Sequence, residues 1–453
     1  MTRMADGTTN KLWRDGFGRE VRSSTLRFDG SELKTDRIYN GKGQLWKVSL
    51  PYKTGNATQW DIYTYNEDGR LSSINYASGR SIVYTYNGRS TTTTTDGVAV
   101  TKTINTKGEL IRVTDPKGEI IYTLRPDGQP QKIEAHGVTT FFDYDSYGRR
   151  ITINDPSAGI RSFTYNDNGQ LHTETDADGR TVTYTYDTYG RLSDVYRPEL
   201  NTHYSYNNKN QLVNVLSDNG SGEVLTYDEF GRTATCKTLL PDNKYLKREF
   251  SYQAGNIIAT KYSNQYSVLG TERFTYSNGC LKTITFGNCQ VWQLQEENNM
   301  GQCITDKSAS VYHRYSFGDT GILTGQMMLR NSTPLMNFGY GFNSSTGNLS
   351  WRKDIARNKT ENFGYDNINQ LTSYSGNTVT YDDKGNILAK SDAGLTMAYN
   401  HASKPYAVTS IASGFLPAAV MYSPQNITYN SFESPDTITD NGLTCTFVCV
   451  FRR

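Results

Sequence analysis

A six-residue motif returns along this chain at a nearly constant step. It reads Tyr144-Asp-Ser-Tyr-Gly-Arg149 and comes back as Tyr165-Asn-Asp-Asn-Gly-Gln170 and as Tyr186-Asp-Thr-Tyr-Gly-Arg191. Further copies begin at Tyr206 and Tyr227, so the starting tyrosines are separated by 21, 21, 20 and 21 residues. A chain built in this way must stack similar units, each of which contacts mainly its neighbours.

Each copy is predicted to be a short β-hairpin. The segment Thr181–Tyr186 alternates so that Val182, Tyr184 and Tyr186 share one face of a strand, and Tyr, Thr and Val are good strand formers. Asp187–Gly190 has Asp at the first and Gly at the fourth position of a type I turn. Arg191–Val195 then begins the return strand.

The return strands pose a question that the sequence leaves open. Leu192 and Val195 are three residues apart, and this spacing puts two side chains on opposite faces of a regular strand. Either a bulge intervenes, or both faces of the sheet are partly covered. A second Gly-containing turn, such as Asp176–Gly179, follows the return strand in several copies, so one repeat comprises two strands and two turns.

The number of copies predicts the fold class. Other copies begin at Tyr39, Tyr65, Ile104, Leu124, Phe317, Phe342, Tyr365 and Tyr381, Tyr252 and Tyr276 open shortened ones, and Tyr86 and Glu297 stand at the expected step without most of the motif. Roughly 17 copies give about 34 strands, and open twisted sheets rarely exceed about 10 strands without curling. We therefore expect an all-β chain of tandem hairpins in a long antiparallel sheet that winds into a spiral or an open hollow shell.

The regularity of the motif suggests a division of the chain. A degenerate, truncated first repeat is followed by regular repeats, degenerate repeats, further regular repeats and a truncated end, at residues 1–38, 39–233, 234–345, 346–400 and 401–453. We expect the sequence to be a fragment of a longer shell protein.

Composition and scattered polar residues exclude several functions. The 47 Lys and Arg nearly balance the 45 Asp and Glu, which argues against nucleic-acid binding. No apolar run is long enough to span a membrane, and no signal peptide is visible. The five histidines form no metal-binding spacing, and neither a nucleophile elbow nor a phosphate-binding loop occurs. We expect no cofactor, no metal and no catalytic residue.

The motif Tyr-Asp-x-x-Gly-Arg-Leu, seen in full at Tyr186–Leu192, resembles the YD repeat of the Rhs (rearrangement hot spot) family. The resemblance covers about residues 14 to 400 and implies a hollow β-shell that encloses a C-terminal toxic domain in bacterial polymorphic toxins. It also implies a secreted or cell-surface protein whose partners are the remainder of the same shell or that toxin domain. The structural motif residues are Tyr144, Asp145, Gly148, Arg149, Tyr165, Gly169, Leu171, Tyr186, Asp187, Gly190, Arg191, Leu192, Tyr227, Asp228, Gly231 and Arg232.

The sequence departs from that family in one respect. The family's toxins cut themselves at an Asp-Pro-x-Gly-type segment after the repeats, and no such segment follows Tyr399. Asp115-Pro-Lys-Gly118 has these letters but lies between two copies, so we interpret it as a repeat turn.

Two functions fit these observations. The first is a non-catalytic wall segment of a shell that encapsulates or displays a toxin domain. The alternative is a secreted or cell-surface carbohydrate-binding or adhesion protein, in which exposed Tyr rows stack on sugar rings of glycans. In either case the Arg side chains of the turns (Arg70, Arg149, Arg191, Arg232) are predicted to stack on neighbouring Tyr rings as cation–π pairs.

Overall fold

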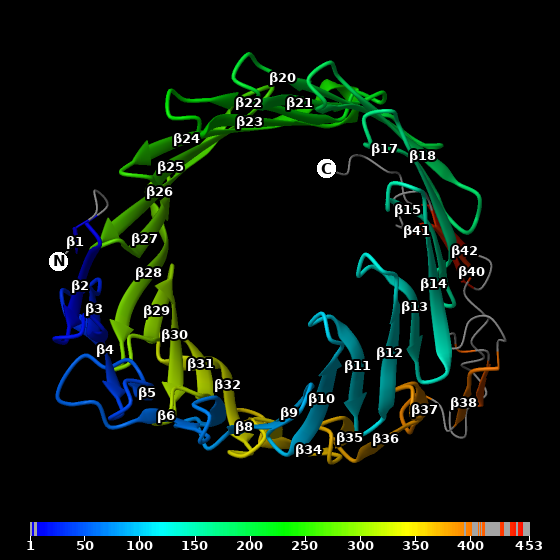
Figure 1. The fold of residues 1–453 in the computed structure, drawn as a ribbon. Helices are drawn as coiled ribbons and strands as arrows, with labels where there is room; N and C mark the ends of the chain where they lie inside the picture. Colours follow the sequence, from blue (N-terminus) through cyan, green and yellow to red (C-terminus); the bar gives the residue numbers. More distant parts are fainter. Residues whose placement is uncertain are drawn as a thin grey trace. The chain divides into compact units, whose positions relative to one another are not determined.

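The computed structural model describes residues 2–3, 7–393, 396–400, 406, 408, 410–412, 426–429, 435–440 and 443–446 (Figure 1). These residues contain strands and turns, one short 3₁₀ turn at Pro241–Asn243, and no α-helix. Strands β1 to β37 belong to one long sheet, while β38–β39 and β40–β42 form two small ones. The all-β, antiparallel hairpin fold predicted from the repeat is confirmed.

The strands follow one another at short intervals. The first eleven are β1 Thr2–Arg3, β2 Thr9–Arg14, β3 Glu20–Leu26, β4 Glu32–Tyr39, β5 Leu45–Ser49, β6 Trp60–Tyr65, β7 Leu71–Asn75, β8 Ser81–Asn87, β9 Ser90–Thr95, β10 Val98–Ile104 and β11 Leu110–Asp115. The next fourteen are β12 Gly118–Leu124, β13 Pro130–Ala135, β14 Val138–Tyr144, β15 Arg150–Asp155, β16 Gly159–Tyr165, β17 Leu171–Thr175, β18 Thr181–Tyr186, β19 Leu192–Tyr196, β20 Thr202–Tyr206, β21 Leu212–Ser217, β22 Gly222–Tyr227, β23 Thr233–Leu239, β24 Tyr245–Gln253 and β25 Asn256–Asn264.

The remaining strands continue the pattern to the last described residues. They are β26 Val268–Ser277, β27 Cys280–Phe286, β28 Cys289–Glu297, β29 Cys303–Ser308, β30 Val311–Phe317, β31 Leu323–Arg330, β32 Thr333–Phe342, β33 Leu349–Asp354, β34 Lys359–Tyr365, β35 Leu371–Tyr374, β36 Asn377–Tyr381, β37 Ile387–Lys390, β38 Thr396–Ala398, β39 Ser410–Ala412, β40 Asn426–Tyr429, β41 Pro435–Asp440 and β42 Leu443–Thr446.

The repeat predicts the strand ends closely. Strands β14, β16, β18, β20 and β22 each end on the first residue of a motif copy, and a Gly-containing or Asn-containing turn follows. We call this turn the YD turn, and we call the second turn of each repeat, which leads into the next Tyr-bearing strand, the return turn. Because successive antiparallel strands reverse direction, all YD turns lie on one edge of the sheet and all return turns on the other.

The return strands contain a bulge, and this settles the question of the three-residue spacing. In the β18–β19 pair, Tyr186 is opposite Leu192 and Thr185 is opposite Asp194, so one extra residue stands on β19. The extra residue brings Val195 opposite Tyr184, on the face that Leu192 and Tyr186 share. The same shift recurs in β16–β17, β20–β21 and β22–β23.

The chain divides into two compact units, which we describe separately. Unit 1 comprises residues 1–119, 252–259 and 271–392, and unit 2 comprises residues 120–251, 260–270 and 393–453. The division of the chain by motif regularity differs from these units and stays a prediction. Among the described residues the buried apolar side chains are few, with Val195 and Val215 the most completely covered, so contacts between neighbouring repeats must supply much of the stability.

Candidate functional site

The repeat tyrosines of unit 2 form a ladder of hydrogen bonds from one repeat to the next. Each hydroxyl donates to a backbone carbonyl at or near the first residue of the preceding return strand. The five bonds are Tyr144 to Pro130 at 2.7 Å, Tyr165 to Arg150 at 2.7 Å, Tyr186 to Leu171 at 2.8 Å, Tyr206 to Leu192 at 3.0 Å and Tyr227 to Leu212 at 2.6 Å. Burial raises the pKa of Tyr186, so this hydroxyl keeps its proton and remains a donor.

The first residue of each YD turn closes the turn on itself. In the turn after β18, the Asp187 carboxylate accepts hydrogen bonds from the backbone N–H groups of Tyr189, at 2.8 Å, and Arg191, at 3.0 Å. The guanidinium of Arg191 also donates to Asp187, at 2.7 Å. Partial burial alone would raise the pKa of Asp187, but the Arg191 side chain and the two backbone donors outweigh it and lower the pKa.

Charged and neutral YD turns alternate along unit 2. Asp–Arg pairs close the turns that begin at Asp145, Asp187 and Asp228, and Asn–Gln pairs close those that begin at Asn166 and Asn207. The glutamine amide of a neutral turn reaches the next turn, as Gln170 Nε2 does at 2.7 Å from the Gly190 carbonyl oxygen. The period of the side-chain chemistry is therefore two repeats, although the period of the backbone is one.

Each arginine of a charged turn lies against aromatic rings, as the sequence predicts. The Arg191 guanidinium carbon lies 4.9 Å from the ring centre of Tyr189 in its own turn and 4.4 Å from that of Tyr206 in the next repeat. Arg149 likewise lies between Tyr147 and Tyr165, at 5.0 and 4.7 Å. The remaining predicted cases are also found, with Arg70 against Tyr86 and Arg232 against Phe230. Each such pair contributes about 0.5–1 kcal/mol at an exposed site.

Removing one rung of the ladder tests its contribution. Tyr186→Phe leaves the carbonyl of Leu171 without its donor, and we expect the free energy of local opening of β17–β19 to fall by about 1–2 kcal/mol. Amide hydrogen exchange measures this opening. The control is Tyr189→Phe, whose ring is 79% exposed at the turn tip and for which we expect no change. Equal effects of the two substitutions would contradict the ladder.

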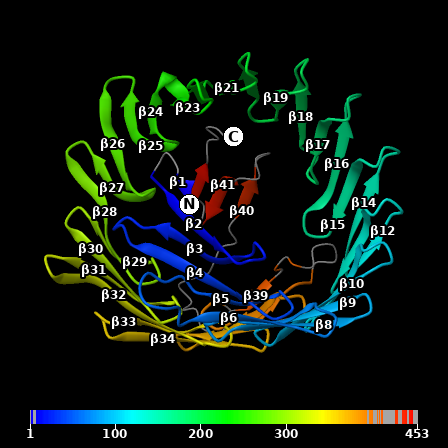
Figure 2. The same ribbon diagram turned by 60° about the vertical axis from the view of Figure 1, so that its left-hand side comes forward.

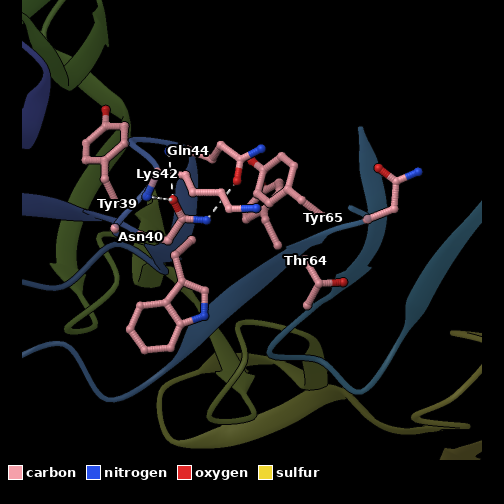
Figure 3. A pocket seen from close by; sticks show the side chains of 10 residues that line it. Tyr39, Asn40, Lys42, Gln44, Thr64 and Tyr65 are labelled. Carbon is pink, nitrogen blue, oxygen red and sulfur yellow. Dashed lines mark hydrogen bonds between the residues drawn. The ribbon is translucent and has the colours of Figure 1, made fainter. Parts of the chain in front are cut away.

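A groove lies between two neighbouring YD turns of unit 1. It measures about 540 Å³ and includes Tyr39, Lys42, Trp46 and Tyr63 in its lining (Figure 3). Its polar groups mostly bond within the protein, as the dashed line from Asn40 Nδ2 to Gln44 Oε1, at 2.9 Å, shows in Figure 3.

The bonds that join neighbouring repeats run beside this groove. Gln44 Nε2 donates to the Gly69 carbonyl at 3.1 Å, and the Tyr65 hydroxyl donates to the Leu45 carbonyl at 2.8 Å. These are the same two bonds that link repeats in unit 2. The side-chain amide of Gln44 and the hydroxyl of Tyr65 are therefore already engaged within the protein.

Two histidines have partners that the sequence did not reveal. His203 lies between two carboxylates, with Nδ1 2.7 Å from Asp194 Oδ1 and Nε2 2.7 Å from Asp218 Oδ1. His313 lies 2.7 Å from Asp306, which is 5% exposed. Both ring nitrogens of His203 are occupied, so the ring is not a free general base. The described residues contain no group of His, Cys, Asp and Glu that could hold a metal ion.

The setting of His203 gives stability a pH dependence. Hydrogen bonds to Asp194 and then to Asp218 raise the pKa of His203 above its usual 6.5. Because the pKa of His203 is higher in the folded than in the unfolded protein, the protonated ring stabilises the fold. This contribution is complete below pH 6.5 and disappears as the pH rises through the pKa of His203 in the folded protein. We expect His203→Gln to lose more stability relative to the wild type at pH 5.5 than at pH 8.5, in urea unfolding followed by fluorescence. An equal loss at both values would contradict the pairing.

The segment with the letters of a cleavage motif is a return turn. Asp115–Gly118 connects β11 to β12, and the Asp115 carboxylate accepts from the backbone N–H groups of Lys117 and Gly118, at 2.8 and 3.0 Å. As in the YD turns, the carboxylate of the first residue accepts hydrogen bonds from the backbone of its own turn. Within the described part of the chain, no helix has the length and apolar character needed to cross a membrane.

Comparisons with known proteins agree with this geometry. A search of curated proteins returned no match. Among solved structures, the chain resembles TcdB2–TccC3–Cdc42 with a TM-score of 0.77 at 15% identity, covering 95% of this chain and 28% of that one. It resembles the Photorhabdus luminescens Tc holotoxin pore with a TM-score of 0.76 at 15% identity, again over 95% and 28%. TcdB2–TccC3 without its hypervariable C-terminal region matches at 0.72 and 15% identity, over 96% and 29%.

At this level of identity the structures show the fold alone, and the chain spans less than a third of the proteins it matches. The family assignment comes from the sequence. The model of the teneurin YD-shell matches residues 39–414, which is well over half of the chain. The repeat predicted as Rhs-like is thus confirmed, and the protein belongs to the teneurin YD-shell family.

Proposed function

We propose that this chain is a stretch of wall in a YD-repeat shell that encloses or displays a toxin domain, and that it catalyses no reaction. The observation that carries the proposal is the ladder. The polar groups of the regular repeats, including those of Tyr186, Asp187 and Arg191, are bonded to the same or the neighbouring repeat. Repeated chemistry that serves only contacts between neighbours builds a surface rather than a site.

The partners that fit this role are the remainder of the same shell and a C-terminal toxin domain. The matched structures are Tc toxin assemblies, and one of them is described as lacking a hypervariable C-terminal region. We infer that the present chain has the same kind of neighbour and acts outside the cell or at its surface. The motif residues listed above are then the structural residues of the wall.

The carbohydrate-binding alternative gains no support from the ladder tyrosines, although the turn-tip rings of Tyr147 and Tyr189 are 83% and 79% exposed. The repeat tyrosines lie in the ladder with their hydroxyls bonded, and the groove of Figure 3 has its amides bonded within the protein. Glycan binding therefore stays a prediction, and quenching of Tyr fluorescence by a soluble polysaccharide would test it.

Protease protection tests the wall proposal. The protein is produced as its gene encodes it, with an epitope tag at the last residue, and is digested in native buffer and after denaturation. We expect the tag to survive in native protein and to be cut rapidly once the protein is unfolded. A matched variant carries the tag in the YD turn at Tyr189, which is 79% exposed, and should be cut in both states. Equal cleavage of the two tags in native buffer would reject enclosure.

A further inference from the structure

Unit 1 contains two runs of strands that meet edge to edge (Figure 2). The early run is β2–β11 and the late run is β26–β37. Where they meet, a YD turn of the late run contacts a return turn of the early run. Ser277 Oγ donates to the Phe28 carbonyl and Asn278 Nδ2 to the Arg27 carbonyl, each at 2.8 Å.

The same polarity holds at the following turns. The Lys53 backbone N–H donates to the Asn299 carbonyl at 2.7 Å, and the Asn299 side chain accepts from the Thr54 N–H at 2.8 Å. Further along, the return turn at Gly79 packs closely on the YD turn at Ser344. A Cβ added to Gly79 would lie only 3.1 Å from the Ser344 carbonyl oxygen. Each contact joins a return turn of the early run to a YD turn of the late run. In unit 1, therefore, a YD-turn edge docks on a return-turn edge.

The docked YD turns differ chemically from the undocked ones. Asn278 and Asn299 occupy the tips of docked turns and bond the opposing backbone. In undocked turns the tip is often an aromatic ring that lies open to solvent. The exposed fractions are 86% for Phe17 in unit 1, and 83% for Tyr147, 79% for Tyr189 and 73% for Phe230 in unit 2.

These rings stand in a defined row rather than at random. In unit 2 they mark every second YD turn, at the charged turns with an Asp–Arg pair. The guanidinium of an arginine in the same turn lies against each ring. Its carbon is 5.0 Å from the ring centre of Tyr147 and 4.9 Å from those of Tyr189 and Phe230. Since neighbouring strands are about 4.8 Å apart, alternate repeats place the rings roughly 20 Å from one another. Tyrosine, which has an apolar ring and a polar hydroxyl, is enriched at protein interfaces.

The return-turn edge of later strands also carries exposed apolar side chains. In unit 1, at or beside return turns, Leu335 is 55%, Ile355 48% and Val291 44% exposed. In unit 2, Tyr266 lies in the return turn between β25 and β26 and is 82% exposed. Val268, the first residue of β26, is 58% exposed. One chain therefore displays both an aromatic YD-turn edge and an apolar return-turn edge.

We propose that the aromatic YD-turn edge is a docking surface for the apolar return-turn edge of a second copy of this chain. The contact repeats between copies the polarity that unit 1 shows within one copy. It is heterologous, because the two surfaces differ, so each copy keeps one free edge and association does not stop at two. The inference rests on the proposed wall role and adds to it which edge meets which.

Sedimentation velocity of the full chain at increasing concentration tests the proposal. We expect the mean sedimentation coefficient to rise with concentration. A tip variant, Tyr147→Ser with Tyr189→Ser and Phe230→Ser, and an edge variant, Leu335→Ser with Ile355→Ser, should each associate less. Phe141→Ser is the matched control, because Phe141 is 49% exposed on β14 and away from both edges.

Mixing the two variants gives the decisive result. The tip variant retains its apolar edge and the edge variant retains its rings, so the mixture should form a one-to-one complex. Disulfide trapping between Tyr189→Cys in one copy and Leu335→Cys in another checks the contact without removing it. A wild-type chain that stays monomeric, or a mixture that forms no complex, would overturn the docking proposal. Neither result affects the tag-protection test, so failure of docking is distinguishable from failure of the wall role.

Discussion

Replacing Glu297 by glutamine is expected to loosen the N-terminal strands of unit 1. The Glu297 side chain is 2% exposed and forms ion pairs with Arg27 and with Lys53, which is 7% exposed. Arg27 Nε lies 3.0 Å and Lys53 Nζ 3.0 Å from Glu297 Oε2. Removing the carboxylate takes away negative charge that balances Arg27 and Lys53. Removing one partner of a buried ion pair costs about 3–5 kcal/mol of stability.

The expected result is local and can be measured locally. We take the lower end of that range, because the Arg27 side chain is 24% exposed, so the free energy of opening of β3–β5 should fall by about 3 kcal/mol. Amide exchange in these strands would then accelerate roughly a hundredfold, whereas strands β14–β22 of unit 2 should exchange as before. An unchanged rate in β3–β5 would contradict the role of the buried carboxylate.

Two further variants separate the ion pairs from the repeat motif. Glu297→Tyr restores the residue that most copies have at this position. We expect it to be as unstable as Glu297→Gln, because Arg27 still lacks the Glu297 carboxylate and Lys53 keeps only Asp29, at 3.2 Å. Asp68→Asn removes the ion-pair partner of Arg70 at an exposed site, where the Asp68 side chain is 67% and the Arg70 side chain 50% exposed. This substitution should lower the free energy of unfolding by at most about 1 kcal/mol.

Gly222→Ala is expected to disrupt the β21–β22 hairpin of unit 2. Gly222 has a φ of +152°, and a Cβ added there would lie 2.1 Å from the Val215 carbonyl oxygen and 2.9 Å from Leu216 Cα. Both are backbone atoms, so the overlap can be relieved only by moving the strand. Backbone strain and overpacking each cost about 1–3 kcal/mol, and together we expect a loss of about 3–5 kcal/mol.

The measurement for Gly222→Ala is limited proteolysis of the hairpin combined with amide exchange in β20–β23. Gly16→Ala is the matched control, because no heavy atom lies within 4 Å of its added Cβ and its φ is not positive. This control should leave β2–β3 unchanged. If β20–β23 of Gly222→Ala resist proteolysis and amide exchange as well as those of the wild type, the expected clash at Gly222 is contradicted.

Much of the local structure was predictable because each repeat touches the next. The Tyr, Asp, Gly and Arg positions of the motif predict strand ends, turns and cation–π pairs, and these contacts involve residues within about 20 positions of each other. The bulge in the return strands was one of two open alternatives, since a spacing of three is compatible with either. The pairing of Leu192 with Tyr186 and of Val195 with Tyr184 decides between them.

Glu297 shows where sequence reasoning fails. By its position it is a repeat copy that has lost its tyrosine, and nothing nearby in the sequence indicates a partner. Its partners, Arg27 and Lys53, precede it by more than 240 residues. The same holds on a smaller scale for His203, which meets Asp194 and Asp218 only through the register of β19, β20 and β21, since Asp218 directly follows β21.

The sequence by itself determined the hairpins, their order and the cation–π pairs between neighbours, because a 20–21-residue repeat places the same groups at the same local distances in each regular copy. The tertiary structure alone decided which edges meet, which glutamate is buried and which aromatic rings stay exposed. The physical reason is that small strand twists add up over many strands, so the turn that faces Arg27 depends on all the strands between them.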